Sequence, residues 1–280
     1  MIRAKKSLGQ NFLSDAQVAR RIVESVSPQA TDIILEIGPG TGALTMLLLE
    51  RSGYVVAIEI DRRLIDELRH ELSAKNLLIV EADALAIDWN DLIKEAINSW
   101  RELRGSQSAE PRVRIVANLP YYISTPIIER LMSLRGRLFD LTLMLQDEVV
   151  DRITSKPGTR EYGYLSVLVQ FHAEATKLFE VSPSAFKPAP KVQSAILHLI
   201  MRERPVVEVS DERKFFALVG AAFAQRRKTI LNNLKAAAAA LNFKQPIDAA
   251  LRSAGIEPQR RAETLSLAEF GALHRALYES

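Results

Sequence analysis

The feature that most constrains the fold of this chain is an alternation of short apolar runs with amphipathic segments over residues 1–200. The apolar runs occupy 33–37, 55–60, 77–83, 113–118 and 141–146. Segments with helical spacing follow them, among them 42–51, 61–74, 88–103 and 125–134. This order predicts a parallel sheet with helices on both faces, because parallel strands need crossover connections. Two later runs, 175–181 and 194–200, predict an antiparallel pair that closes the sheet.

The strand pattern stops at about residue 205, and the rest of the chain has helical spacing. This change predicts two domains, an α/β domain over residues 1–204 and a small all-helical domain over residues 205–280. Residues 201–280 contain 13 Lys and Arg and 9 Asp and Glu, while the whole chain has a net charge of +3. The C-terminal segment is therefore predicted to carry a basic face for an anionic partner.

Composition narrows the classes of site that the chain could hold. There is no cysteine, so disulfides and thiolate metal sites are excluded. The four histidines (His70, His172, His198 and His274) lack ligand spacing, and no metal site is expected. No apolar run reaches the roughly 18 residues that a membrane span needs, and the N-terminus lacks the apolar stretch of a signal peptide. We expect a cytoplasmic protein, monomeric by default.

A glycine-rich loop follows the first predicted strand. Its sequence is GPGTGA, residues 38–43, and Gly38 and Gly40 would let a ligand approach the backbone. With Ala43 the loop fits the NAD pattern, and its G-x-G-x-G form also fits S-adenosylmethionine (SAM) enzymes. A tight turn before a helix would explain the same glycines, so the loop alone leaves these alternatives open.

Two acidic residues follow the next two predicted strands. Glu59 lies at the end of the second strand, where a carboxylate can accept both ribose hydroxyls of a nucleoside. Asp83 lies at the end of the third, where it could accept from an adenine amino group. Either residue alone could be a helix cap. Together with the glycine loop they favour binding of an adenosyl group at the carboxyl edge of the sheet.

The fourth predicted strand ends in NLPY, residues 118–121. The amino group of adenine is a poor nucleophile because its lone pair is delocalised, and two acceptors aimed at its N–H groups would help to localise that pair. The side-chain oxygen of Asn118 and the backbone carbonyl of Leu119 can serve as these acceptors. Pro120 biases Leu119 towards an extended conformation, and Tyr121 offers a ring for stacking. The tetrapeptide therefore predicts amine methylation. A strand-ending turn with a buried tyrosine is the simpler alternative.

The chain resembles the ribosomal RNA adenine dimethyltransferases, and within them the small-subunit branch. The resemblance is carried by KKSLGQNFL (5–13), ILEIGPGTGALT (34–45), VVAIEID (55–61), VEADAL (80–85), VANLPYYIST (116–125), LMLQDEVVDRI (143–153), AFKPAPKVQSAIL (185–197) and AFAQRRKTILNNL (222–234). It implies a Rossmann-like SAM-dependent methyltransferase domain with a small helical C-terminal domain. It also implies dimethylation of two adjacent adenosines near the 3′ end of 16S rRNA, late in assembly of the small ribosomal subunit, with SAM as donor and no metal.

The resemblance also assigns roles to residues. Cofactor contacts are implied for Asn11, Leu13, Gly38, Glu59, Asp83 and Asn118. The target amine would be held by Asn118, Leu119 and Tyr121, and Phe186 would stack on the base opposite Tyr121. Without the resemblance, Phe186 is expected to be a core residue. Relatives often have Asn after NLPY, whereas this chain has Tyr122, which could alter the rim of the site.

Basic residues gather in short clusters. They are Arg3, Lys5 and Lys6 in the N-terminal arm, Arg226, Arg227 and Lys228 in a predicted helix, and the pair Arg260 and Arg261. Each could contact RNA phosphates, and the resemblance favours this role for 226–228. For any single one of them, a solvated helix face is the better explanation.

Other readings of the sequence remain open. A large-subunit adenine methyltransferase of the macrolide-resistance type would share the fold, but QRRKTILNNL and RAETLSLAEF favour the small-subunit branch. An NAD-dependent oxidoreductase would explain the glycine loop and leave NLPY unexplained. A non-catalytic ribosome assembly factor would not need NLPY and both acids.

Overall fold

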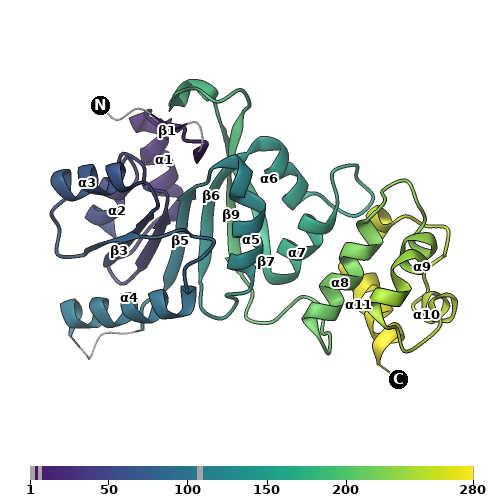
Figure 1. The fold of residues 1–280 in the computed structure, drawn as a ribbon. Helices are drawn as coiled ribbons and strands as arrows, with labels where there is room; N and C mark the ends of the chain where they lie inside the picture. The colour runs from purple at the N-terminus through teal and green to yellow at the C-terminus, as the bar shows by residue number, and fades with distance from the viewer. Residues whose placement is uncertain (1–3, 6–7, 106–109, 280) are drawn as a thin grey trace. The chain divides into compact units, whose positions relative to one another are not determined.

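The computed structural model describes residues 4–5, 8–105 and 110–279. Arg3 and Lys6, predicted to contact RNA, lie outside the described residues. The chain divides into two compact units, one of Met1–Val150 with Glu174–Met201 and one of Asp151–Ala173 with Arg202–Ser280. Each unit has its own hydrophobic core, and Figure 1 shows the elements of both. None of the described helices is long and apolar enough to cross a membrane.

The first unit is built on a seven-stranded sheet with the order β4-β3-β2-β5-β6-β9-β7. The strands are β2 (Ile33–Ile37), β3 (Tyr54–Glu59), β4 (Leu77–Glu81), β5 (Val113–Asn118), β6 (Asp140–Gln146), β7 (Ala173–Val181) and β9 (Ser194–Met201). The first five are parallel to their neighbours, and β9 runs antiparallel to β6. The predicted parallel sheet with two late closing strands is therefore confirmed.

Helices cover the sheet. They are α1 (Ala16–Val26), α2 (Thr45–Arg51), α3 (Arg62–Glu71), α4 (Trp89–Arg104), α5 (Ser124–Met132) and α6 (Asp147–Thr154). Side chains from alternate positions of the strands, such as Ile34, Val116 and Met144, share one core cluster with residues of α1 and α2. Every residue of β2 is buried, as expected for a strand with both faces covered. This core fixes the strand ends that carry the predicted site.

Two elements of the first unit were not predicted. Helix α1 begins after Asp15, whose side chain accepts hydrogen bonds from the backbone N–H groups of Gln17 and Val18. A short antiparallel pair joins β1 (Phe12–Leu13) to β8 (Phe186–Lys187). This pair ties the N-terminal segment to a loop far along the chain.

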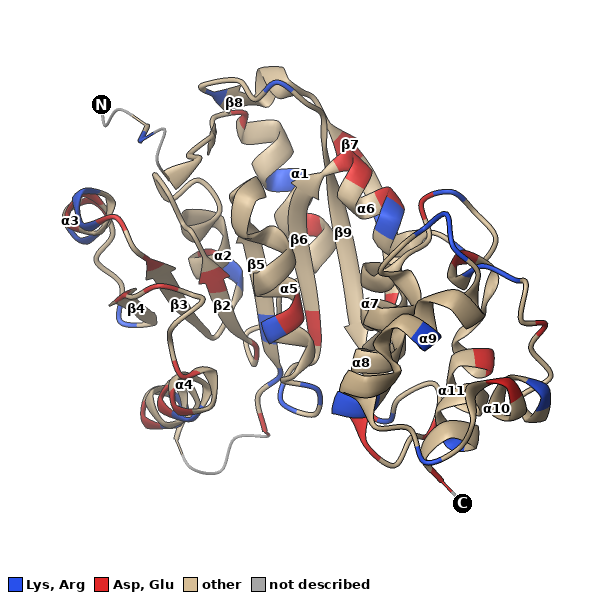
Figure 2. Ribbon diagram, turned by 45° about the vertical axis from the view of Figure 1, so that its right-hand side comes forward, with Lys and Arg blue, Asp and Glu red and all other residues tan. Residues whose placement is uncertain are grey.

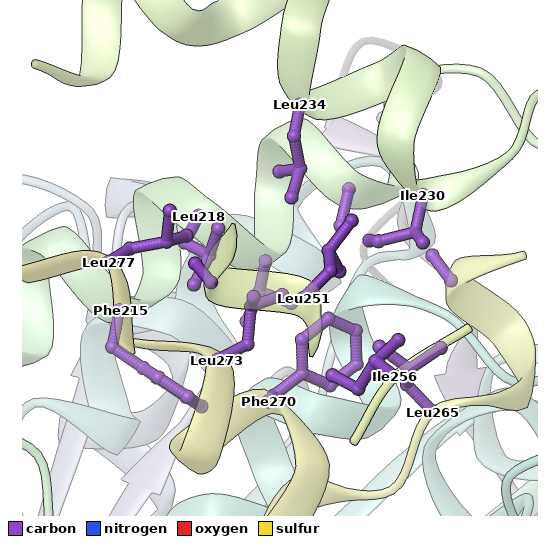
Figure 3. Close-up of a cluster of buried hydrophobic side chains, with 14 of the residues drawn as sticks. Phe215, Leu218, Ile230, Leu234, Leu251, Ile256, Leu265, Phe270, Leu273 and Leu277 are labelled. Atoms are coloured by element: carbon purple, nitrogen blue, oxygen red, sulfur yellow. The ribbon is translucent and has the colours of Figure 1, made fainter. Parts of the chain in front are cut away.

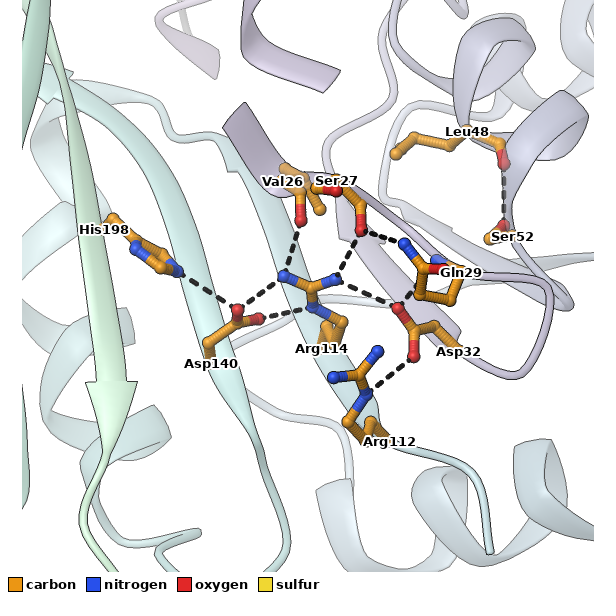
Figure 4. Close-up of polar contacts among 10 residues, drawn as sticks. All are labelled: Val26, Ser27, Gln29, Asp32, Leu48, Ser52, Arg112, Arg114, Asp140 and His198. Carbon is orange, nitrogen blue, oxygen red and sulfur yellow. Dashed lines mark hydrogen bonds and ion pairs between the residues drawn. The ribbon is translucent and has the colours of Figure 1, made fainter. Parts of the chain in front are cut away.

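Strand β5 is fixed at its start by a buried ion network (Figure 4). The side chain of Arg114 donates to both oxygens of Asp140, at 2.7 and 2.6 Å, and to Asp32 at 3.0 Å. It also donates to the carbonyl groups of Val26 and Ser27 at the end of α1. The N–H groups of a buried guanidinium need acceptors. The acceptors of Arg114 lie on β6, before β2 and at the end of α1, so these contacts connect the start of β5 to those segments.

The second unit is helical. Its helices are α7 (Tyr164–His172), α8 (Glu212–Phe223), α9 (Ile230–Leu241), α10 (Ile247–Ser253) and α11 (Leu267–Tyr278). Leucine, isoleucine and phenylalanine side chains from α8 to α11 form most of its core (Figure 3). The sequence-based division at residue 204 placed 151–173 in the first domain, but Val167 and Phe171 of α7 pack in this second core. The segment therefore groups with the C-terminal helices because its apolar side chains are buried there.

Candidate active site

A cleft with a volume of about 250 Å³ opens at the carboxyl ends of β2, β3 and β5. The order of the parallel strands reverses here, since β2 leads to β3 on one side and lies beside β5 on the other, and ligands bind at such points in open α/β sheets. Most of the predicted site residues line this cleft: Asn11, Leu13, Gly38, Gly40, Glu59, Asp83, Asn118, Leu119, Pro120 and Tyr121. The structure thus brings together residues that lie far apart in the sequence.

The glycine loop forms the floor of the cleft. Gly38 and Gly40 have φ angles of +68° and +60°, a region that favours glycine because it has no Cβ. A Cβ on Gly40 would lie 3.2 Å from the ring of Phe12. The loop therefore leaves open backbone beside the strand ends, which suits the close approach of a ligand.

The two predicted acidic residues differ in burial. Oε1 of Glu59 accepts the backbone N–H groups of Ile60 and Asp61, both at 2.9 Å. Burial raises the pKa of Glu59, although N–H groups of Asp61, Ile60 and Gly40 lower it. Asp83 is exposed and accepts the N–H of Leu85 at 2.8 Å, so it caps a turn as well as lining the cleft. Each carboxylate retains an oxygen that could accept from a ligand.

Glu36 is a third carboxylate in the cleft lining, and the sequence analysis missed it. Burial raises the pKa of Glu36 to about 7, the Thr45 hydroxyl lowers it, and the charge of Glu59 raises it further. Among the described residues, Glu36 Oε2 and Thr45 Oγ1 have no hydrogen-bond partner. A buried carboxylate without a partner is costly. Because Glu36 lines the cleft, a cationic or hydrogen-bond-donating ligand group beside it would reduce this cost.

The amide of Asn118 is oriented by the N-terminal segment. Its Nδ2 donates to the backbone carbonyl of Asn11 at 3.2 Å. In the described part of the chain, the Asn118 Oδ1 and the Leu119 carbonyl accept no hydrogen bond. The N–H of Leu119 donates to the backbone carbonyl of Met144 on β6. This bond anchors Leu119, and the carbonyl of Leu119 remains available. Two unused acceptors therefore lie next to each other at the end of β5.

Two tyrosines follow these acceptors with different roles in the fold. The hydroxyl group of Tyr121 lies 2.8 Å from Oγ of Ser194 on β9, a buried residue that the sequence did not indicate. Burial raises the pKa of Tyr121, so it remains a neutral phenol, and the bond to Ser194 fixes its ring. Tyr122 is 60% exposed at the rim of the cleft. It is the more accessible of the two rings.

The cleft arm, defined here as residues 8–13, covers part of the cleft, and every residue in it belongs to the lining. A Cβ on Gly9 would lie 3.1 Å from the ring of Tyr122, and Phe12 packs on Gly40. At its C-terminal end the arm continues into the pairing of β1 with β8. The arm thus spans the cleft from the glycine loop to the tyrosines.

Phe186 is not in the cleft lining. Its residue is 3% exposed and packs in the core of the first unit, opposite Leu13 in the β1–β8 pair. The structure thus agrees with the expectation of a core residue, and stacking of Phe186 on a base opposite Tyr121 stays a prediction. Tyr122 is the exposed ring at the rim.

The basic residues fall into different environments. Arg226, Arg227 and Lys228 were predicted in a helix but lie in the loop between α8 and α9, because α8 ends at Phe223 and Thr229 caps α9. All of this basic loop, residues 226–228, is exposed and lines a surface hollow. Figure 2 shows where Lys and Arg lie along the ribbon. The buried Asn233 holds the loop by donating to the carbonyls of Ala222 and Gln225.

In the basic loop, Arg226 donates to the backbone carbonyl of Arg160. The other described basic residues of the predicted set form ion pairs within the protein. Lys5 Nζ lies 2.9 Å from Asp61 Oδ1. Arg260 forms an ion pair with Glu269 and donates to the carbonyl of Thr264. Arg261 lies 3.9 Å from Glu263. These contacts make the basic loop the best-exposed cluster of the predicted set.

Comparisons with known proteins agree with this site. A family model described as ribosomal RNA adenine dimethylase matches residues 1–273. The chain belongs to this family. It is 46% identical over 277 residues to the ribosomal RNA small subunit methyltransferase A of Shouchella clausii (strain KSM-K16), which covers 99% of this chain and 90% of that protein.

Solved structures of related enzymes have the same fold. A dimethyladenosine transferase from Plasmodium falciparum matches with a TM-score of 0.74 and 27% identity, covering 94% of this chain and 95% of that one. The 23S rRNA methyltransferase ErmE matches with a TM-score of 0.69 and 26% identity, covering 95% and 99%. As a ribosomal RNA adenine dimethylase, the chain is a SAM-dependent rRNA adenine dimethyltransferase with a Rossmann-like fold. The NAD-dependent alternative is thereby removed.

Proposed function

We propose that this dimethylase transfers methyl groups from SAM to the 6-amino groups of two adjacent adenosines near the 3′ end of 16S rRNA, giving dimethyladenosines. The substrate would be an immature small ribosomal subunit in the cytoplasm, late in assembly. The observation that carries the proposal is the pair of unused acceptors, Asn118 Oδ1 and the Leu119 carbonyl, at the mouth of the cleft. The name of the Shouchella relative supports the small-subunit target.

The hydrogen-bond acceptors of the cleft fit the donors of SAM. The molecule presents N–H and O–H donors at its ammonium group, its ribose and its adenine, and the cleft presents acceptors at Glu36, Glu59 and Asp83. The unpartnered Oε2 of Glu36 would receive the ammonium group. Glu59 would accept the ribose hydroxyls, Asp83 the adenine amino group, and Gly38 and Gly40 would allow close approach of the amino-acid part. When bound, SAM supplies a methyl group on a sulfonium.

The protein's contribution to the transfer is positioning. Asn118 Oδ1 and the Leu119 carbonyl would accept the N–H groups of the adenine amine, which localises its lone pair towards the methyl group. The contact between Asn118 Nδ2 and Asn11 sets the direction of the acceptor before the base arrives, and preorganised acceptors of this kind lower the barrier. Neither acceptor is basic, so the proton that the amine loses passes to solvent.

The tyrosines would hold the base. Tyr121, with its hydroxyl fixed on Ser194, would offer a ring face, and such stacking contributes about 1–3 kcal/mol per base. The basic loop of the second unit, and Lys5 if its ion pair opens, would contact RNA phosphates. A base in a loop leaves its stack more readily than one in a duplex, which suits a target near an RNA end.

The deciding experiment is methyl transfer from radiolabelled SAM to small subunits whose rRNA lacks these methyl groups. Wild-type protein, Asn118→Ala and the control Asn76→Ala run in parallel, since Asn76 lies outside the cleft lining and donates only to Leu49. Incorporation of methyl groups on two adenosines, lost in Asn118→Ala and kept in Asn76→Ala, is expected. Label in large-subunit RNA would contradict the proposed target. No label despite normal subunit binding would favour an assembly factor.

A further inference from the structure

The side chain of Asp61 is fully buried and lies two residues beyond Glu59. Its Oδ1 accepts from Lys5 Nζ at 2.9 Å, and its Oδ2 accepts from Gln10 Nε2 at 3.1 Å. Arg63 donates to the same carboxylate through its side chain, at 3.1 and 2.7 Å. Asp61 itself does not line the cleft, so the proposed chemistry leaves this buried charge without a role.

The contacts of Asp61 reach the N-terminal end of the cleft arm. Lys5 is also bonded to Gln10, whose Oε1 accepts the N–H of Lys5 at 2.7 Å, and the N–H of Leu8 donates to the Lys5 carbonyl. Lys5, Gln10 and Asp61 therefore form one closed set of bonds. At the other end, the arm is held by the β1–β8 pair. The span between these two attachments covers the cleft.

We propose that Asp61 is a positioning residue that holds the cleft arm over the cofactor through Lys5 and Gln10, and thereby sets the affinity for SAM. The inference rests on the proposed SAM site and adds to it a residue that touches no ligand. Asp61 is placed for this task by its own N–H, which donates to Glu59 Oε1 at 2.9 Å. Asp61 thus links the arm, through its carboxylate, to the strand end that would bind the ribose, through its backbone N–H.

The expected change in the Kd for SAM follows from the fraction of molecules in which the cleft arm is closed. A ligand that binds only the closed arm has an apparent Kd equal to its intrinsic Kd divided by the closed fraction. Charge-assisted bonds to a buried carboxylate are strong, so losing them should leave the arm closed for a minor fraction of the time. We expect the Kd for SAM to rise by about tenfold if the closed fraction falls to about a tenth.

Variants on both sides of the contact separate this role from general stability. Lys5→Met removes the ammonium group that binds Asp61 and leaves the residues of the cleft arm itself unchanged. Asp61→Ser removes the carboxylate but keeps a residue that can cap α3, a task that Asp61 now performs. Arg63→Met is the matched control, because Arg63 binds the same carboxylate and belongs to α3, not to the arm.

Two measurements test the proposal: the Kd for SAM by calorimetry, and hydrogen exchange of residues 8–13 without SAM. Lys5→Met and Asp61→Ser should each raise the Kd about tenfold and speed exchange in the arm. The double variant should be no worse than Asp61→Ser, and Arg63→Met should stay within about twofold of wild type. Additive losses, or an equal loss in Arg63→Met, would overturn the proposal.

The two proposals fail differently. Wild-type protein that does not bind SAM would refute the proposed cofactor site, and the exchange measurement would still show whether Asp61 holds the arm. Faster exchange in Asp61→Ser with an unchanged Kd would refute the role in cofactor binding and leave the proposed function intact.

Discussion

At the scale of single residues, the cleft contains carboxylates whose protonation depends on burial. Glu36 is the clearest case, because its pKa is raised to about 7 and its Oε2 has no partner in the described chain. A carboxylate that is half protonated near neutral pH would respond strongly to a cationic ligand. If the ammonium group of SAM lies beside it, the complex should hold Glu36 in its ionised form.

We therefore predict that SAM affinity rises with pH up to about pH 7 and levels off above it. Binding would favour the ionised carboxylate, so below the pKa of the free protein each complex must release a proton. The rise should approach tenfold per pH unit at most. Calorimetry from pH 5.5 to 8.5 measures it, and Glu36→Gln should weaken binding and flatten the profile. An equally steep profile in Glu36→Gln would assign the effect to another group.

Without SAM, the contribution of Glu36 to the free energy of unfolding should fall as pH rises, whereas SAM affinity rises. The folded protein binds the Glu36 proton more tightly than the unfolded chain, whose pKa is near 4.5. The resulting stabilisation is fully present below pH 4.5 and is lost as pH rises through about 7. Relative to Glu36→Gln, the Tm of the wild type should therefore fall between about pH 5 and pH 8. A constant difference between the two proteins would contradict this assignment.

Tyr122 gives a second prediction at this scale. Its exposed ring at the rim is placed to stack on an RNA base, which is worth about 1–3 kcal/mol. Tyr122→Ala should raise the KM for the subunit by about 5- to 150-fold, while Tyr122→Phe stays near wild type. The Kd for SAM is the control, because Tyr122 also packs against Gly9 of the cleft arm. An equal loss in both constants would mean that the ring supports the arm and does not bind RNA.

The sequence predicted the acceptors and missed their supports for a physical reason. Asn118, Glu59 and Asp83 each end or follow a strand, and the carboxyl ends of parallel strands meet at one edge. Glu36 lies inside a strand pattern, and only the fold shows that its oxygen reaches the cleft. Ser194 and Asp61 act through partners distant in sequence, so no local pattern could reveal them. Phe186 could not be placed because its ring direction depends on the β1–β8 pairing.

At the scale of elements, strand β5 carries the site at one end and the Arg114 network at the other. Arg114 lies between two buried carboxylates, Asp32 and Asp140, and its side chain is 6% exposed. Burial alone would raise the pKa of Asp140, but His198 and Arg114 hold it below its usual value. Arg114 is therefore the one guanidinium that binds both buried carboxylates, with Arg112 as a second partner of Asp32 and His198 as a second partner of Asp140.

We predict that Arg114→Met lowers the free energy of unfolding of the first unit by about 3–5 kcal/mol, because it removes the buried cation that Asp32 and Asp140 share. Arg112→Met is the matched control. Arg112 binds the same Asp32 with a half-exposed side chain, and its loss should cost about 1 kcal/mol or less. Urea denaturation followed by tryptophan fluorescence measures both, since Trp89 and Trp100 lie in α4 of this unit. Equal losses in the two variants would contradict the role of Arg114.

Some elements could be predicted from a pattern in their own residues, and others could not. The alternation of apolar runs predicted the parallel sheet because its central strands β2, β3, β5 and β6 are buried on both faces. The β1–β8 pair has only two residues in each strand, too few for a periodic pattern. The stretch QRRKT has no glycine or proline, so the sequence predicts that the helix continues through the basic loop. In the structure α8 ends at Phe223, before this loop.

At the scale of the whole molecule, chemistry and charge are divided between the two units. The cleft belongs to the first unit and the basic loop to the second. The domain boundary could not be predicted fully, because apolar residues such as Leu165, Val167 and Phe171 occur on several sides of α7. A helix without a polar face gives no sign of which core it joins.

We predict that replacing Arg226, Arg227 and Lys228 with serine weakens binding to the subunit and reduces its dependence on salt. Three lost phosphate contacts should lower the slope of log K against log salt by about 2–3. The Kd for SAM should not change. The matched control replaces Arg62, Lys75 and Lys94, which are exposed on the first unit. An unchanged salt slope would show that the basic loop does not contact RNA.

The hydrogen bond from Asn118 to Asn11 has a consequence for how successive methyl groups are added. Each transfer consumes one SAM, so the spent cofactor must leave before the next transfer. If the cleft arm opens for this exchange, the carbonyl that orients Asn118 moves away and the base loses its acceptor. We expect methylation to be distributive at the level of the base, with monomethyladenosine accumulating early in the reaction. Mass spectrometry of rRNA nucleosides during the first turnovers would detect it.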